Sequence, residues 1–185
     1  MLFRSPAVIP FGGSSVLGAQ GYVECARELL DQAPDLDTVV TALGSGGTMA
    51  GLVAHLGAER VLGVHCGAVA DPATTVANLV SGLSGKADSL RIDLDQVGDG
   101  YSTLTPQVAD ALTLTARTEG IILDPIYTGR AMAGLIAAAD SGVLRSGRRI
   151  IFLHSGGLPG FFGHANTVTW AQATPSTPTR LTPQE

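Results

Sequence analysis

A strand–loop–helix–strand succession early in the chain constrains the fold more than any other feature. The β-branched, apolar run at residues 38–43 is bounded by Asp37 and Gly44, which is typical of a buried strand. A glycine-rich turn, an apolar helical stretch and a second apolar run at residues 60–66 follow. Strands joined through a helix run parallel, so this unit predicts an α/β fold built on a parallel sheet.

The same alternation of helical and extended patterns continues along the chain. Apolar spacing predicts helices over residues 19–30, 74–83, 104–118 and 128–140, and strands at residues 121–123 and 149–154. Beyond residue 164, threonine and proline replace the apolar spacing, so residues 165–185 are expected to form a disordered tail. We therefore expect residues 1–164 to form an open, mostly parallel sheet with flanking helices.

The charge composition excludes several classes of protein. A net charge of −5 with 11 basic residues argues against a nucleic-acid partner, and no apolar run approaches the roughly 20 residues that span a membrane. Cys25 and Cys66 suit a reducing, cytoplasmic compartment better than a disulfide framework. Charged residues make up only 15% of the chain, and Lys86 is its single lysine. This scarcity predicts that further polypeptide or a second copy covers part of the surface.

Three segments follow predicted strands or open predicted helices, where parallel sheets bind their ligands: residues 44–48, 124–129 and 154–157. The first is a glycine loop that consists of Gly44, Ser45, Gly46, Gly47 and Thr48. Its backbone amides and the following helix N-terminus favour a phosphate group. The alternative is an ordinary glycine turn in which Thr48 caps the helix. The loop lacks the endings of a nucleoside-triphosphate loop and of a dinucleotide-binding loop.

Five blocks in order resemble one family of enzymes. They are residues 9–14 (Ile-Pro-Phe-Gly-Gly-Ser), 21–25 (Gly-Tyr-Val-Glu-Cys), 44–48, 123–135 (Leu-Asp-Pro-Ile-Tyr-Thr-Gly-Arg-Ala-Met-Ala-Gly-Leu) and 154–157 (His-Ser-Gly-Gly). Together they resemble the D-cysteine desulfhydrase and 1-aminocyclopropane-1-carboxylate deaminase family. These are pyridoxal-phosphate enzymes with the tryptophan-synthase β-type fold, and the resemblance, which runs from Pro6 to His164, is to their C-terminal half.

The resemblance implies a role for each matching residue. Residues 44–48 would hold the phosphate of pyridoxal 5'-phosphate, and Thr128 and Ser155 would also contact the cofactor, with Ser155 facing its pyridine nitrogen. Tyr127 and Tyr101 would lie near a small amino-acid substrate. Without the resemblance, both tyrosines would be interpreted as aromatic side chains with satisfied hydroxyls.

Thr128 and Ser155 also distinguish between activities within the family. Ring-opening deaminases of the family typically carry glutamate and leucine at these positions. A neutral hydroxyl opposite the pyridine nitrogen suits elimination of a thiolate. The resemblance therefore favours elimination from D-cysteine to pyruvate, ammonia and sulfide, with an activity like that of the deaminases as the alternative.

The resemblance also implies that a lysine is missing. In the family, the lysine in Schiff-base linkage to the cofactor belongs to an N-terminal half that would precede residue 9. Lys86 lies in a polar stretch and is no substitute. We therefore expect the isolated chain to be inactive and to work with a separate N-terminal half or a homodimer partner. A non-catalytic, phosphate-binding remnant is the remaining alternative.

Overall fold

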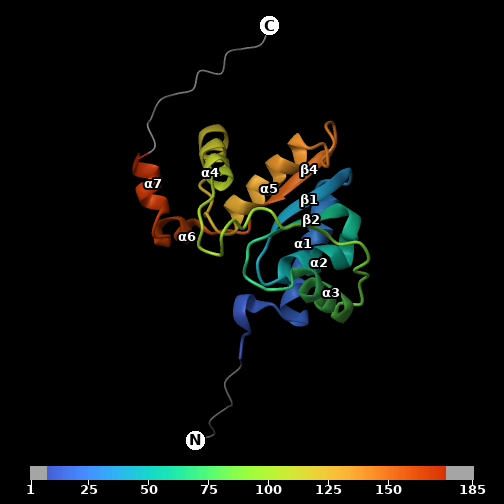
Figure 1. The fold of residues 1–185 in the computed structure, drawn as a ribbon. Coiled ribbons are helices and arrows are strands. Elements are labelled where there is room, and N and C mark those ends of the chain that lie inside the picture. Colours follow the sequence, from blue (N-terminus) through green and yellow to red (C-terminus); the bar gives the residue numbers. More distant parts are fainter. Residues whose placement is uncertain (1–7, 174–185) are drawn as a thin grey trace, which may run out of the picture.

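Four parallel strands form one sheet in the computed structural model, which describes residues 8–173 (Figure 1). The strands are β1 (Leu36–Leu43), β2 (Val61–His65), β3 (Arg91–Asp93) and β4 (Arg149–Leu153). Their spatial order is β3-β2-β1-β4, and each neighbouring pair is parallel. In β1, Val40 pairs with Leu62 on one side and with Phe152 on the other. The predicted α/β fold with a parallel sheet is confirmed.

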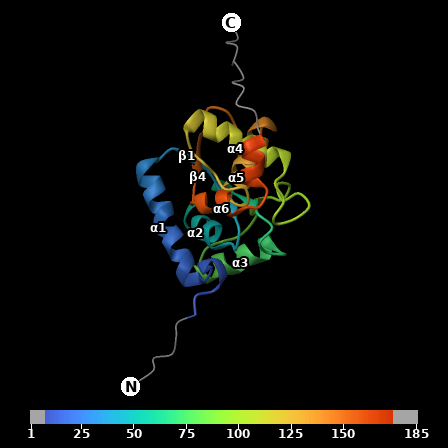
Figure 2. The same ribbon diagram turned by 90° about the vertical axis from the view of Figure 1, so that its left-hand side faces the viewer.

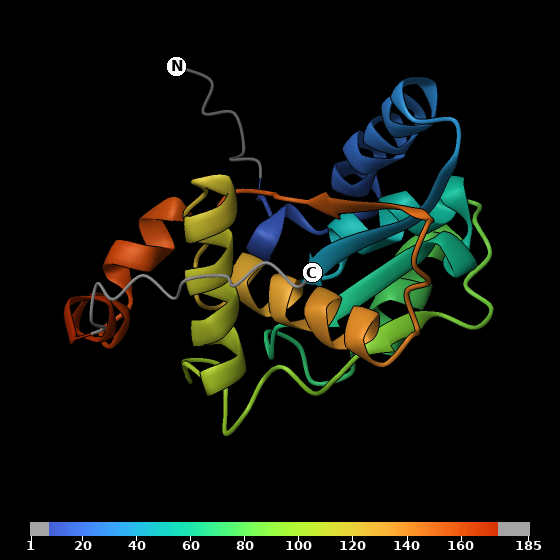
Figure 3. The ribbon, with the colours of Figure 1, turned by 90° about the horizontal axis from the view of Figure 1, so that it is seen from above.

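Helices cover both faces of this sheet (Figures 1 and 3). Helices α1 (Val16–Gln32), α2 (Gly47–Leu56) and α3 (Pro72–Gly82) pack on one face. Helix α5 (Thr128–Asp140) packs on the other, and α4 (Pro106–Glu119) lies against α5. Figure 2 shows α1, α2 and α3 gathered away from α4 and α5. The remaining elements are η1 (Phe11–Gly13), η2 (Ala58–Arg60), α6 (Leu158–Gly163) and α7 (Thr167–Ala173).

The central strand β1 is buried on both faces. Val39 and Leu43 pack with α1, α2 and α3, whereas Val40 and Ala42 pack on the side of α5. All four side chains are at most 9% exposed. A strand covered on both faces is apolar throughout rather than alternating, which is why the sequence of β1 reads as one continuous run. Within residues 8–173, no helix has the length and apolarity that a membrane crossing requires.

One predicted strand is wrong. Residues 121–123 belong to no strand and pair with none of the strands among residues 8–173. Leu123 is buried, but Ile121 and Ile122 are 43% and 41% exposed. Backbone groups of a strand need a neighbouring strand to complete their hydrogen bonds, so apolar sequence alone does not make one.

Helix boundaries follow capping residues more closely than apolar spacing. The Asp71 side chain accepts a hydrogen bond from the Thr74 amide, and α3 begins at Pro72. Thr105 caps α4 in the same way, and Pro106 opens that helix. Proline suits these first positions because it lacks an amide that would otherwise be unpaired.

The structure also contains elements that periodicity did not predict. Strand β3 and helices α6 and α7 are short, and α7 falls within the range 165–185 for which composition predicts a disordered tail. There Thr167 is fully buried, and Trp170 packs against the apolar cluster between α4 and α5. Tertiary packing therefore forms a helix at residues 167–173, and residues 174–185 lie outside the described part of the chain.

Candidate functional site

The order of the strands reverses beside β1. The chain runs from β1 through α2 to β2 on one side, whereas β4 pairs with β1 on the other side. In open α/β sheets, ligands bind beyond the carboxyl ends of the strands at such a reversal. The loop after β1 is the glycine loop, and the loop after β4 contains Ser155. Both loops therefore lie where this architecture binds a ligand.

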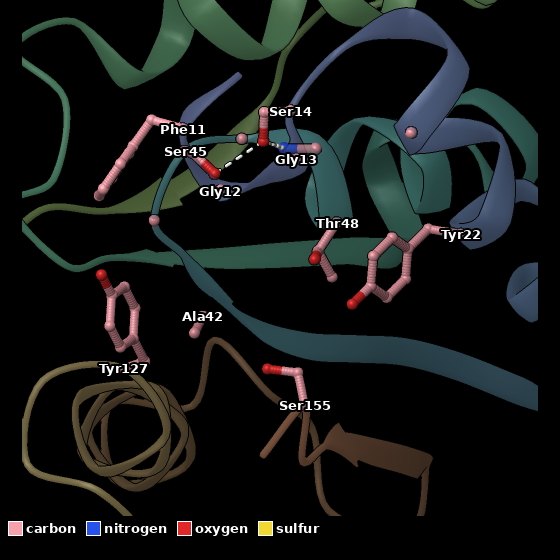
Figure 4. A pocket seen from close by; sticks show the side chains of 14 residues that line it. Phe11, Gly12, Gly13, Ser14, Tyr22, Ala42, Ser45, Thr48, Tyr127 and Ser155 are labelled. Carbon is pink, nitrogen blue, oxygen red and sulfur yellow. Dashed lines mark hydrogen bonds between the residues drawn. The ribbon is translucent and has the colours of Figure 1, made fainter. Parts of the chain in front are cut away.

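A cavity of about 320 Å³ opens at this place (Figure 4). Its volume lies at the lower end of the roughly 300–1,000 Å³ typical of small-molecule sites. Four parts of the chain contribute: the segment before α1 with the first two turns of that helix, the end of β1 with the loop and helix start that follow it, the residue before α5, and the loop after β4. The lining residues are Phe11, Gly12, Gly13, Ser14, Gly18, Tyr22, Ala42, Gly44, Ser45, Gly46, Gly47, Thr48, Tyr127 and Ser155.

The glycine loop presents unpaired backbone donors to the cavity. Gly46 has a φ of +96°, a left-handed conformation that only glycine adopts without strain, and α2 begins directly after it. Within residues 8–173, the amides of Ser45, Gly46 and Thr48 have no hydrogen-bond acceptor. The partial positive charge at the helix N-terminus adds to their attraction for an anion. These residues therefore fit a phosphate group.

The alternative in which Thr48 caps α2 is wrong. Helix α2 begins at Gly47, which places Thr48 inside its first turn, and the N-cap residue Gly46 has no side chain to cap it. The loop is thus not an ordinary side-chain-capped turn, and its free donors remain available to a ligand.

Ser14 reaches this loop from a distant part of the sequence. Its Oγ accepts a hydrogen bond from the Gly47 amide at 3.1 Å and lies 2.6 Å from the Ser45 Oγ (Figure 4). Tyr22 of α1 also lines the cavity, on the side of Thr48. Sequence analysis did not predict either residue for the site, although both belong to blocks that carry the family resemblance.

Two tyrosines meet at the other side of the cavity. Tyr127 and Tyr101 share a hydrogen bond between their hydroxyls, and their rings stand edge to face at 75° with centroids 6.1 Å apart. The Tyr127 ring lies so close to Gly44 that a Cβ there would be 2.9 Å from Cε1. Burial and the hydrogen bond with Tyr101 raise the pKa of Tyr127 well above its ordinary value. Tyr127 therefore keeps its proton at neutral pH.

Asp124 holds the start of α5 in place. Its Oδ2 accepts hydrogen bonds from the amides of Ile126 and Tyr127 at 2.9 and 2.8 Å. Its Oδ1 accepts from the amide and the hydroxyl of Thr128, both at 2.8 Å. The carboxylate is 1% exposed and thus replaces water for four donors. It orients Tyr127 toward the cavity, a role that sequence analysis did not predict for it.

The structure brings together most of the residues that sequence analysis selected. Those on the cavity are Gly44, Ser45, Gly46, Gly47, Thr48, Tyr127 and Ser155. Tyr101 does not line the cavity but contacts it through Tyr127. Thr128 is fully buried with its hydroxyl on Asp124, so its side chain does not reach the cavity. Lys86 is exposed in the loop after α3 and is not among the lining residues.

Comparisons with known proteins agree with this geometry. A family model described as pyridoxal-phosphate dependent enzyme matches residues 4–156. The crystal structure of an ACC deaminase homologue is 34% identical with a TM-score of 0.78, and the match covers 90% of this chain and 54% of that one. The chain thus spans about half the length of that homologue. A fungal L-serine ammonia-lyase from Rhizomucor miehei is 15% identical over 76% of this chain and 52% of that one, and its TM-score of 0.49 is too low to support a conclusion.

The matched residues include the glycine loop, Tyr127 and Ser155, the groups that surround the cavity. The family match also covers the whole sheet, from β1 to β4. Sequence, fold and cavity therefore agree, and the chain belongs to the family of pyridoxal-phosphate dependent enzymes.

Proposed function

We propose that this chain forms the phosphate-binding side of a pyridoxal-phosphate-dependent lyase that acts on D-cysteine. The reaction converts D-cysteine and water into pyruvate, ammonia and hydrogen sulfide. One observation carries the proposal: unpaired loop amides, a hydrogen-bonded pair of phenols and the Ser155 hydroxyl surround or adjoin a single cavity at the sheet reversal. The family membership adds the cofactor class to this geometry.

The loop residues would bind the cofactor through its phosphate. The amides of Ser45, Gly46 and Thr48 supply donors, and the hydroxyls of Ser45 and Thr48 line the same cavity. No lysine or arginine is among the lining residues, so the phosphate would rest on backbone donors and the N-terminus of α2. When bound, the cofactor supplies an electron sink for charge that develops at the Cα of an amino acid.

The two phenols would hold a proton beside the substrate. Because Tyr127 stays protonated at neutral pH, its hydroxyl would donate a hydrogen bond or a proton to a leaving or charged group of the substrate. The hydroxyl of Tyr101 is the hydrogen-bond partner that keeps the Tyr127 hydroxyl in one orientation. Together they present a donor of fixed direction rather than a base.

Ser155 and position 128 favour elimination over ring opening. Ser155 is a neutral hydroxyl on the cavity and would face the pyridine nitrogen, which leaves that nitrogen without a proton. Thr128 contributes no carboxylate to the cavity. Both features suit loss of a thiolate, which is a good leaving group. The likeness to an ACC deaminase homologue supports ring opening as the second candidate function.

Amide NMR tests the phosphate site. Inorganic phosphate or pyridoxal phosphate is expected to shift the amide resonances of residues 44–48 before any others. Gly46→Ala adds a Cβ at a φ of +96° and 3.2 Å from the Thr75 Cγ2, so it should raise the Kd for phosphate about tenfold or more. Titrations of the two proteins, followed by the same resonances, measure the difference.

The matched control is Gly142→Ala. Gly142 has a φ of +75°, and a Cβ there would meet nothing within 4 Å, so the variant carries a similar backbone strain of about 1–2 kcal/mol away from the cavity. Its phosphate affinity should equal that of the unchanged chain. Saturating phosphate that leaves the amides of residues 44–48 unmoved would contradict the assignment of the cavity.

A further inference from the structure

A buried arginine, Arg130, forms hydrogen bonds with the backbone of the loop between β3 and α4. The Arg130 side chain is 0% exposed, and no carboxylate of residues 8–173 forms a salt bridge with it. Its Nη1 donates to the carbonyl of Cys66 at 2.6 Å. Its Nη2 lies within 2.9–3.2 Å of four carbonyl oxygens on the loop, those of Val97, Gly100, Tyr101 and Thr103.

Burial of this charge is costly, because a charge removed from water needs hydrogen bonds or a counter-charge. Here five backbone carbonyls supply the hydrogen-bond acceptors, and the Asp124 carboxylate attracts the guanidinium without forming a salt bridge with it. The Nε of Arg130 has no hydrogen-bond partner among the described residues. All acceptors of its other nitrogens belong to two connections, the one after β2 and the loop of residues 97–103. The guanidinium thus joins those two connections to α5.

Tyr101 belongs to the loop of residues 97–103 that Arg130 holds. The carbonyl of Tyr101 itself accepts from Nη2, while its hydroxyl bonds to that of Tyr127. Tyr101 is 44% exposed, so few other contacts determine where its ring lies. Arg130 stands three residues after Tyr127 on α5 and therefore holds both tyrosines relative to the same helix.

We infer that Arg130 is a positioning residue that places the Tyr101 phenol against the Tyr127 phenol at the edge of the cavity. It acts through the backbone of residues 97–103 and touches neither hydroxyl. The inference rests on the proposed function insofar as the phenol pair would serve the substrate. This clamp, the set of hydrogen bonds from Arg130 to the backbone at residues 66 and 97–103, is present in the chain without cofactor.

The test follows the phenol of Tyr127 directly. The chain has three tyrosines, and NMR of protein labelled with ¹³C at tyrosine Cζ resolves each phenol, with Tyr→Phe variants for assignment. Arg130→Lys retains a cation but cannot reach both connections, so the loop should be released. The Tyr127 hydroxyl would then exchange its hydrogen bond with Tyr101 for one with water. At neutral pH, its ¹³Cζ resonance should therefore move to the position that it takes in the Tyr101→Phe chain.

A double-mutant cycle separates positioning from general destabilisation. Tyr101→Phe removes the partner hydroxyl itself, so adding Arg130→Lys to it should move the Tyr127 resonance little further. Leu56→Ala, which removes buried apolar volume on the opposite face of the sheet, should lower the melting temperature without moving this resonance. Arg149→Lys, at an exposed arginine paired with Asp35, should change neither.

Two outcomes would overturn the inference. One is a Tyr127 ¹³Cζ resonance that Arg130→Lys leaves unchanged although the melting temperature falls, which would make Arg130 a structural residue only. The other is an additive effect of Arg130→Lys and Tyr101→Phe. Phosphate titration of residues 44–48 in the same samples is a separate readout. Its failure would contradict the proposed function and leave the clamp in place.

Discussion

Replacing Asp124 with alanine is expected to lower the free energy of unfolding by about 3–5 kcal/mol. The carboxylate accepts three amide hydrogen bonds and one from the Thr128 hydroxyl, at 2.8–2.9 Å, in a place that water does not reach. Alanine would leave those donors buried without an acceptor, which is the costly half of losing a hydrogen bond. Urea unfolding followed by circular dichroism measures the change.

Two further variants sharpen this prediction. Asp140→Ala removes the same residue type from the exposed end of the same helix and should change stability by no more than about 0.5 kcal/mol. Asp124→Asn keeps the side-chain volume but has one acceptor oxygen in place of two. Its loss in the free energy of unfolding should therefore lie between the losses of Asp140→Ala and Asp124→Ala. An Asp124→Ala chain as stable as the Asp140→Ala chain would show that this carboxylate does not hold α5.

The parts of the fold that sequence predicted are those whose local pattern and tertiary role agree. The run in β1 is apolar because both faces of the strand are buried, so pattern and burial point to the same structure. Strand β3 is three half-buried residues, and its state depends on pairing with β2. Residues 121–123 show the converse, since they have the apolar pattern of a strand but lack a neighbour. Pairing is a property of the whole chain.

The site divides in the same way. The glycine loop was predictable because its chemistry lies in backbone amides and needs only its own five residues. The strand order that brings Ser155 to the same cavity was not, because it depends on which side of β1 the last strand pairs. The Thr128 hydroxyl is directed by a partner four residues away. The hydrogen bonds of Arg130 depend on a loop about 30 residues away. No local pattern distinguishes such side chains from ordinary helix residues.

Activity is expected to need polypeptide beyond the matched half. The chain covers 54% of the ACC deaminase homologue, and its single lysine is exposed and is not among the residues that line the cavity. Exposed apolar side chains also remain on α6 and on the segment before α5, among them Ile121, Ile122, Leu158 and Phe162. We propose that a polypeptide made from the unmatched part of that homologue covers this surface and supplies the lysine that the family resemblance implies. Burial of apolar surface stabilises the associated pair by about 25 cal/mol per Å², and the conformational entropy lost on association offsets part of this free energy.

Mixing the two polypeptides with pyridoxal phosphate should release sulfide from D-cysteine at least about a hundredfold faster than either alone, because a positioned general base contributes roughly 10²–10⁴-fold. Sulfide and pyruvate assays measure the rate, and a partner whose lysine is replaced by alanine is the matched control. The Gly46→Ala chain should need more cofactor for the same rate, which ties the activity to the loop of residues 44–48. Faster release of ammonia from 1-aminocyclopropane-1-carboxylate than of sulfide from D-cysteine would favour the deaminase alternative. An associated pair that binds the cofactor and produces neither sulfide nor ammonia would contradict the lyase assignment. Phosphate binding without catalysis would then be the function that the cavity supports.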